Sequence, residues 1–173
     1  MKFFISCLLV IFLIGASNAA EESSALIEES DFQSLSANMK EKKLGLVLML
    51  HAENCPYCAL MEREILSPMV VSGDYDKRVV IRKLQIDDSR NIKDFDGSTV
   101  GPSDISNRFG ATVTPTLVFL DYHGKKKAET MVGINTVDYF GVYLDREIDK
   151  LVANIKKEIA DNSAMKKIEK VEK

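Results

Sequence analysis

The sequence is poor in the residues that build disulfide scaffolds and metal centres, with three cysteines and two histidines among 173 residues. Cys7 lies near the N-terminus, whereas Cys55 and Cys58 are three positions apart. A closed structural zinc site needs four ligands, and the chain has no second cysteine pair to supply them. A disulfide that closes so short a loop removes little chain entropy, and a domain of this size does not depend on one. The small number of cysteines and histidines therefore argues against a structural zinc site, and the short loop argues against a purely structural disulfide.

Long apolar runs are also absent, except at the N-terminus, where residues 3–14 follow the positively charged Lys2. This run is shorter than the roughly 20 residues that a membrane-spanning helix needs. With small residues leading up to Ala19, it is typical of a secretory signal peptide at 1–19, cut after Ala19. Cys7 would be removed with the signal peptide. We expect a soluble, exported chain of about 154 residues, and a bacterial periplasm is the simplest destination.

A basic surface is lacking too, because the 23 Lys and Arg residues are interleaved with 26 Asp and Glu residues. No nucleic-acid partner is therefore expected. The short lysine run at 125–127 and the charged C-terminal tail at 161–173 are interpreted as solvated. The sequence also has no internal repeat and no low-complexity linker. We expect a single domain at 31–160, preceded by a flexible leader at 20–30.

The spacing of apolar residues predicts alternating helices and strands. Helices are expected at 31–43, from Pro56 to a stop or kink at Ser67-Pro68, at 103–109 with Ser103 as N-cap, and at 137–159 after Thr136 as N-cap. Strands are expected at 44–50, 79–86, 114–120 and 128–133, with an irregular connection at 87–102. Strands joined through a helix should be parallel, and the last two, joined by a tight turn, antiparallel. This pattern predicts an α/β fold with a mixed four-stranded central sheet flanked by helices on both faces.

The most informative segment is the junction between the strand at 44–50 and the next helix, where Cys55 is located. Free N–H groups and the helix dipole at this point favour an anion, so the thiolate of Cys55 should form readily. Cys58 lies nearly one turn later and deeper. The two cysteines would then have different roles: Cys55 attacks a substrate disulfide, and Cys58 resolves the mixed disulfide. Pro56 fits the first helical turn, and Tyr57 offers an aromatic rim.

Two other interpretations of the cysteine pair stay open. Copper could bind two thiolates, since soft sulfur suits it, although His51 and His123 are the only imidazoles available. His51 is more simply a residue at the end of a strand, and His123 lies in the expected hairpin turn. A redox-inactive interaction domain is the third interpretation. No cofactor or bound metal is expected.

Four landmarks occur in a fixed order: CPYC at 55–58, KLQID at 83–87, VTPTLVFLDYHGK at 113–125 and Gly133. With these landmarks the sequence resembles the thioredoxin superfamily over residues 31–160, which implies the thioredoxin fold. More narrowly, DFDG at 94–97 and the stretch FGATVTPTLVFLD resemble periplasmic thioredoxins associated with sulfur oxidation, the SoxW type.

The resemblance implies a role for four residues. Cys55 matches the attacking cysteine and Cys58 the resolving one. Pro115 matches a proline whose peptide bond from Thr114 is cis, and such bonds are uncommon in folded chains. In the family, the backbone of the residue before this proline pairs with an extended substrate chain, which is a form of β-augmentation.

The sequence also departs from the family pattern. Ordinary thioredoxins have a tryptophan before the first cysteine, where this chain has Asn54 and contains no tryptophan at all. They bury an aspartate six residues before that cysteine, thought to help move the proton of the resolving thiol, and Met49 stands here instead. Lys83 matches the lysine that accompanies this aspartate. Either Glu53 or a water would have to take the missing role, or Lys83 is an exposed lysine at a strand edge.

The resemblance implies a thiol–disulfide oxidoreductase that acts on protein thiols and disulfides. SoxW-like relatives are reductants, recharged by a membrane electron donor. CPYC with Thr114 also resembles periplasmic disulfide isomerases, but these carry a dimerisation domain that the roughly 25 residues before the first strand cannot supply. Oxidases insert a helical domain, for which 59–78 has no room. We therefore predict a monomeric periplasmic disulfide reductase; its potential, its physiological substrate and the direction of electron flow in the cell are not predicted.

Overall fold

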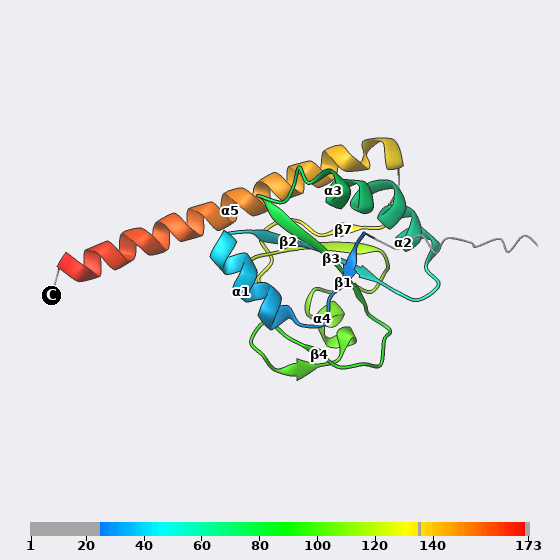
Figure 1. The fold of residues 1–173 in the computed structure, drawn as a ribbon, viewed down its shortest axis with the longest axis horizontal. Coiled ribbons are helices and arrows are strands. Elements are labelled where there is room, and N and C mark those ends of the chain that lie inside the picture. The colour runs from blue at the N-terminus through cyan, green and yellow to red at the C-terminus, as the bar shows by residue number, and fades with distance from the viewer. Residues whose placement is uncertain (1–24, 135, 172–173) are drawn as a thin grey trace, which may run out of the picture.

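The computed structural model describes residues 25–134 and 136–171, with side chains described up to residue 165. The predicted signal peptide lies outside the described residues. A sheet forms the centre of the molecule, and helices cover both of its faces (Figure 1). Within the described residues, no helix is both long and apolar enough to cross a membrane.

The central sheet has five strands in the order β1-β3-β2-β6-β7. Their bounds are Ile27–Glu28 for β1, Gly45–His51 for β2, Val79–Gln85 for β3, Thr116–Leu120 for β6 and Met131–Val132 for β7. β3 runs parallel to β2 and to β1, whereas β6 is antiparallel to β2 and β7 is antiparallel to β6. The sheet is therefore mixed, as predicted, with one short strand added at its edge.

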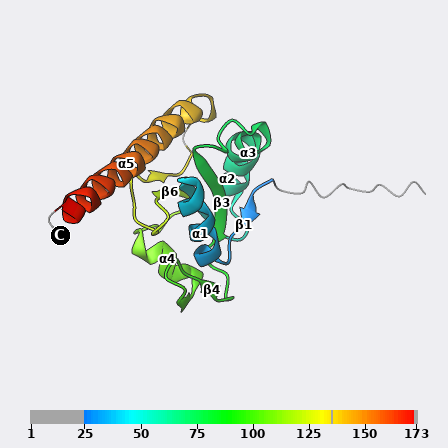
Figure 2. The same cartoon turned by 60° about the vertical axis from the view of Figure 1, so that its left-hand side comes forward.

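The helices divide between the two faces (Figure 2). Their bounds are Phe32–Lys42 for α1, Pro56–Met61 for α2, Ser67–Ser72 for α3, Pro102–Arg108 for α4 and Val137–Val171 for α5, with a π-helix, η1, at Glu62–Leu66. α1 and α4 pack on one face of the sheet, and α2, η1 and α5 pack on the other. Both faces of the central strands are therefore buried.

The side chains of β2 show why helices pack on both faces of the sheet. These side chains alternate between the faces, so Leu46 and Leu48 join the cluster under α1, while Val47 and Met49 join the cluster under α5. All four are fully buried. A continuous apolar run is the pattern of a strand buried on both sides, which is why the strand at 44–50 could be predicted nearly to the residue.

Strand direction was predicted only in part. β2 and β3, joined through α2 and α3, are parallel as expected. The connection from β3 through α4 to β6 does not follow the rule, because β6 pairs with the other edge of β2 and runs antiparallel to it. The rule applies when a helical crossover links two parallel strands of a sheet. Here the chain leaves β3 and enters the sheet again on the far side of β2, where β6 runs in the opposite direction.

Several element boundaries differ from the prediction. Part of the expected leader forms β1, and the expected irregular connection contains a small hairpin, β4 (Ile92–Lys93) with β5 (Thr99–Val100). Gly101, rather than Ser103, occupies the N-cap of α4, where its N–H donates to the Asp104 carboxylate at 2.9 Å. Two-residue strands depend on their pairing partners rather than on local sequence.

The two longest helical segments also run further than predicted. Of the stop or kink predicted at Ser67-Pro68, the stop does not occur: the helical segment continues through these residues, and its regular geometry is interrupted just before them by the π-turn of η1. A proline in a regular helix collides with the carbonyl four residues earlier, and a π-turn relieves this crowding. α5 begins directly after Thr136, as predicted, but continues past residue 159 to Val171 and projects beyond the sheet (Figure 1).

Candidate active site

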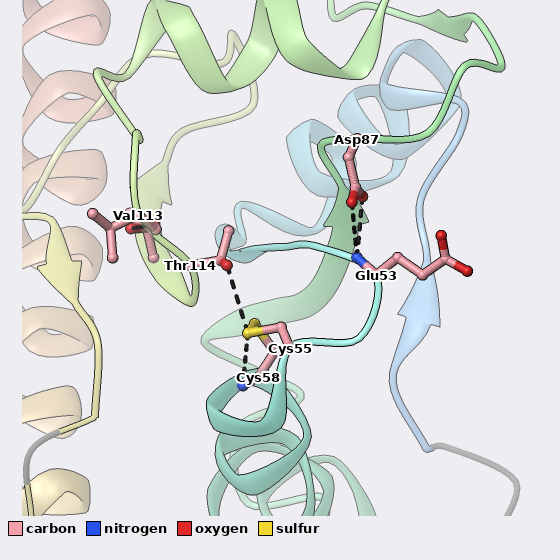
Figure 3. The surroundings of a disulfide bond; sticks show 7 residues. Glu53, Cys55, Cys58, Asp87, Val113 and Thr114 are labelled. Atoms are coloured by element: carbon pink, nitrogen blue, oxygen red, sulfur yellow. Dashed lines mark hydrogen bonds between the residues drawn. A yellow bond between two sulfur atoms is a disulfide. The ribbon is translucent and has the colours of Figure 1, made fainter.

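The cysteine motif follows directly from the end of β2. Asn54 adopts a left-handed conformation, with φ of 54°, which asparagine tolerates better than most residues. Just before it, the N–H of Glu53 donates to both carboxylate oxygens of Asp87 at 3.1 Å (Figure 3). Pro56 then occupies the first position of α2, where its missing N–H costs nothing. These features turn the chain sharply and fix where the helix begins.

Cys55 is the N-cap of α2, and its Sγ accepts a hydrogen bond from the backbone N–H of Cys58 at 3.2 Å. The two cysteines form a disulfide, with their Cα atoms 5.2 Å apart. Cys58 is 4% exposed, whereas Cys55 is only partly buried. The outer sulfur can thus meet a substrate, and the inner one is within reach of it but shielded from solvent.

Thr114 approaches the same sulfur from the other side of the site (Figure 3). Its hydroxyl donates to Cys55 Sγ at 3.5 Å, and its peptide bond to Pro115 is cis. The carbonyl of Pro115 accepts from the N–H of Gly133 at 2.8 Å, which ties this loop to the end of β7. The sequence identified Thr114 for its backbone only. Nothing in the sequence indicated the hydroxyl contact, because it depends on how the loop meets α2.

Lys83 is not the exposed strand-edge residue that one interpretation allowed. Its Nζ lies 2.8 and 3.0 Å from the two carboxylate oxygens of Glu62, and the two side chains are only 16% and 17% exposed. Glu62 was not predicted. The signal that could have found it is its position four residues after Cys58, which places both on one side of a helix.

The other predicted supporting residues lie around the motif, and their roles stay predictions. The carboxylate of Glu53 extends away from the two sulfur atoms (Figure 3). Tyr57 is 62% exposed, and Val113, beside Thr114, is 54% exposed. Both residues, which are close in sequence to Cys55 and to Thr114, therefore present apolar surface to solvent.

His51 lies at the end of β2, and its Nε2 is 2.8 Å from the Glu28 carboxylate of β1. Burial alone would raise the pKa of Glu28, but the contact with His51, the N–H of Gln85 and the charge of Lys83 together lower this pKa. His123 lies instead near Asp94 and Arg108. Among the described residues, no three His, Cys, Asp or Glu side chains gather where they could hold a metal ion.

The motif opens into a shallow depression of about 480 Å³. It is lined by His51, Ala52, Glu53, Asn54, Cys55, Pro56, Cys58, Ala59 and Glu62. The lining contains both cysteines and the carboxylate that pairs with Lys83. The depression thus links the redox pair to Glu62, the acidic member of a partly buried ion pair, through space that solvent can occupy.

A disulfide between two cysteines three positions apart, at a helix N-terminus and beside a cis-proline loop, is the arrangement of thiol–disulfide oxidoreductases. The profile of the thioredoxin-like domain family matches residues 32–147, and the chain belongs to this family. No curated protein matches the chain in sequence.

Two solved structures illustrate what the chain is similar to. Mitochondrial thioredoxin 3 of Saccharomyces cerevisiae, in its oxidised form, is 20% identical, with a TM-score of 0.50 over 73% of this chain and 98% of that one. Thioredoxin O2 of Arabidopsis thaliana, also oxidised, is 21% identical, with a TM-score of 0.48 over 71% of this chain and 94% of that one. The similarity to thioredoxin 3 supports the architecture alone. The enzyme class follows from the family and from the cysteine pair.

Proposed function

We propose that the protein is an exported thiol–disulfide reductase that acts on protein disulfides in the periplasm. One observation carries the proposal: the partly exposed sulfur of Cys55 receives two donors, the N–H of Cys58 and the hydroxyl of Thr114. Both donors favour a negative charge on this sulfur in the reduced protein. Cys58 has no comparable exposure. The site is thus arranged for attack by one sulfur and resolution by the other.

The catalytic cycle starts from the reduced pair. The thiolate of Cys55 attacks one sulfur of the substrate disulfide, forms a mixed disulfide and releases the other substrate sulfur as a thiolate, which takes up a proton. Cys58 then loses its proton and attacks Cys55, so the bond to the substrate breaks and the second substrate thiol is released. Two electrons have passed to the substrate. The protein is left with the Cys55–Cys58 disulfide seen in the structure.

Substrate binding would use the loop before β6. The hydroxyl of Thr114 contacts Cys55, which brings this loop to the redox pair. We propose that the backbone of Thr114 pairs with an extended substrate chain, a form of recognition with little sequence preference. Tyr57 and Val113 supply exposed apolar surface on either side. We propose that these residues position protein substrates, and that a membrane protein returns the electrons to a monomeric chain.

The connection between β2 and β3 supports a reductase over an oxidase. It consists of α2, η1 and α3 without an inserted domain. A disulfide isomerase and a copper-binding thiol module are the alternatives. The equilibrium potential of the pair against a glutathione series separates the redox alternatives: a value near about −270 mV indicates a reductase, one near about −180 mV an isomerase, and one near about −120 mV an oxidant. Stoichiometric copper binding by the reduced protein would favour the metal module.

The direct test of the function uses the two cysteines separately. Cys55→Ser should abolish reduction of a disulfide-bonded protein such as insulin, because the attacking sulfur is gone. Cys58→Ser should accumulate mixed disulfides on non-reducing gels, because nothing resolves them. Full activity of Cys55→Ser would refute the proposal, and a lack of trapped species in Cys58→Ser would refute the resolving role.

Export can be tested independently. Residues 1–30 fused to a reporter enzyme that is active only outside the cytoplasm should give an active reporter. A matched fusion with Leu8, Leu9 and Phe12 changed to Arg should give none, because it breaks the apolar run. Equal activity of the two fusions would contradict the proposed location.

A further inference from the structure

The redox pair lies next to an ion pair that the cycle above does not yet use. Lys83 stands directly opposite Met49 in the pairing of β2 with β3, and Met49 is fully buried and cannot accept a proton. The ammonium of Lys83 instead pairs with the carboxylate of Glu62, which follows α2. A charged pair with so little exposure is costly to bury unless both partners are held in place.

We propose that Glu62 accepts the proton of the Cys58 thiol when Cys58 resolves the mixed disulfide, and that Lys83 positions the carboxylate for this step. The inference rests on the proposed oxidoreductase function and assigns the proton acceptor within it. Glu62 lies four residues after Cys58, and residues at this spacing are neighbours on a helix surface. Both also line the same depression, which has room for a relaying water.

The remaining charged groups near the depression are less suitable acceptors. Glu53 also lines it, but its carboxylate extends away from the sulfur atoms (Figure 3). Glu28 of β1 accepts from His51 and from the N–H of Gln85, and it is not among the residues that line the depression. His51 is held by the same bond. Glu62 is thus the carboxylate that combines shielding from solvent, a fixed cationic partner and proximity to Cys58.

The helix geometry also marks this position. η1 begins at Glu62, and the carbonyl of Glu62 accepts from the N–H of Ser67, five residues on. π-turns inside α-helices occur frequently at functional sites. Here the widened turn begins at Glu62 itself. The helix therefore changes its geometry at the residue that links the redox motif to the ion pair.

The proposed step balances as follows. The proton leaves Cys58 Sγ and binds a carboxylate oxygen of Glu62, directly or through one water. The new thiolate forms a bond to Cys55 Sγ, and the bond from Cys55 to the substrate sulfur breaks, so its electron pair departs with the substrate. The substrate thiolate takes up a proton, and Glu62 returns its own to solvent through the open depression. No further reductant or oxidant is needed.

A two-phase assay isolates this step. Reduced full-length protein mixed with an aromatic disulfide whose thiol is coloured releases one thiol when Cys55 attacks and a second when Cys58 resolves. Glu62→Gln should leave the first phase within about twofold and slow the second roughly ten- to hundredfold near pH 7, the low end of acid–base contributions. The deficit should shrink above about pH 8.5, where a free thiol ionises unaided.

The control is Glu64→Gln, two residues along the same helical segment, where the carboxylate is exposed and pairs with Arg63. It should leave both phases unchanged. If Glu62→Gln does not fold, because Lys83 loses its carboxylate partner, Glu62→Gln combined with Lys83→Met removes both charges and should show the same slow second phase. Equal second-phase rates in wild type and variant near pH 7 would overturn the inference alone. Absence of both phases in the wild type would overturn the proposed function together with it.

Discussion

The hydroxyl of Thr114 is the residue-scale feature that most directly affects reactivity. It is one of two donors to Cys55 Sγ, and it comes from a loop that is 59 residues away in sequence. The other donor, the N–H of Cys58, belongs to the helix itself. A sulfur that receives donors from two independent elements is held in position as well as stabilised in its charged form.

Thr114→Val keeps the shape of this residue and removes the donor. Reduced Cys55 should then react more slowly with an alkylating agent near neutral pH, by about fivefold, which corresponds to the net value of about 1 kcal/mol for one hydrogen bond. The rate measured against pH should shift towards higher pH. Thr112→Val, an exposed position in the same loop, is the control; equal profiles for the two variants would show that the hydroxyl contributes nothing.

At the scale of elements, β1 shows how a two-residue strand can be held. Glu28 accepts from His51 and from the N–H of Gln85 at 2.5 Å, and Glu29 forms a 3.4 Å ion pair with Arg82 and donates its N–H to the Lys83 carbonyl. Backbone pairing alone would be too short to persist. Side-chain contacts therefore fix β1 against β3. In this pairing Glu28 lies opposite Lys83, the residue that forms the ion pair with Glu62.

Glu28→Gln should weaken this attachment, and the exchange of the Gln85 amide hydrogen should become faster near pH 7. The pKa of Glu28 is lowered in the folded protein, so its contribution is present above its ordinary value of 4.5 and is lost as the pH falls through the lowered value. In acid, the Gln85 amide hydrogen of the wild type should therefore exchange as fast as that of the variant. Glu41→Gln, exposed on α1, should exchange like the wild type at every pH.

The same scale shows which elements the sequence could predict. β2 and the buried half of α5 have their own apolar pattern, so their positions were correct. β1 and the β4–β5 hairpin have none, because two-residue strands are selected by their partners. The Lys83–Glu62 pair was not predicted for a related reason: it joins residues that are 21 positions apart, one in η1 and one in β3, and only the tertiary fold brings them together. The cysteine pair was predictable because its chemistry is local.

At the scale of the whole molecule, the packing of α5 on the sheet depends on Gly45. A Cβ at this position would lie 2.6 Å from Cδ2 and 2.7 Å from Cγ of Leu151, and both residues are buried. The absence of a side chain lets α5 approach β2 closely. The same helix then shields the face of the sheet that carries Met49.

Gly45→Ala should lower the free energy of unfolding by about 1–3 kcal/mol, the usual cost of overpacking, as measured by urea denaturation. Combining it with Leu151→Ala should cost less than the sum of the two single changes, since the clash is then relieved. Gly141→Ala, in α5 with no atom within 4 Å of the added Cβ, should instead be neutral or stabilising by up to about 1 kcal/mol. Additive effects at positions 45 and 151 would contradict this account of the packing.

The unequal depth of the two sulfur atoms bears on how the protein withstands damage. A small oxidant such as peroxide meets Cys55 long before it can reach Cys58, which is 4% exposed. A sulfenic acid formed on the outer residue would condense with the thiol beneath it, lose water and become the ordinary disulfide before further oxygen could be added irreversibly. The enzyme thus carries its own protection against oxidative loss, and any reductant that recharges it also repairs it.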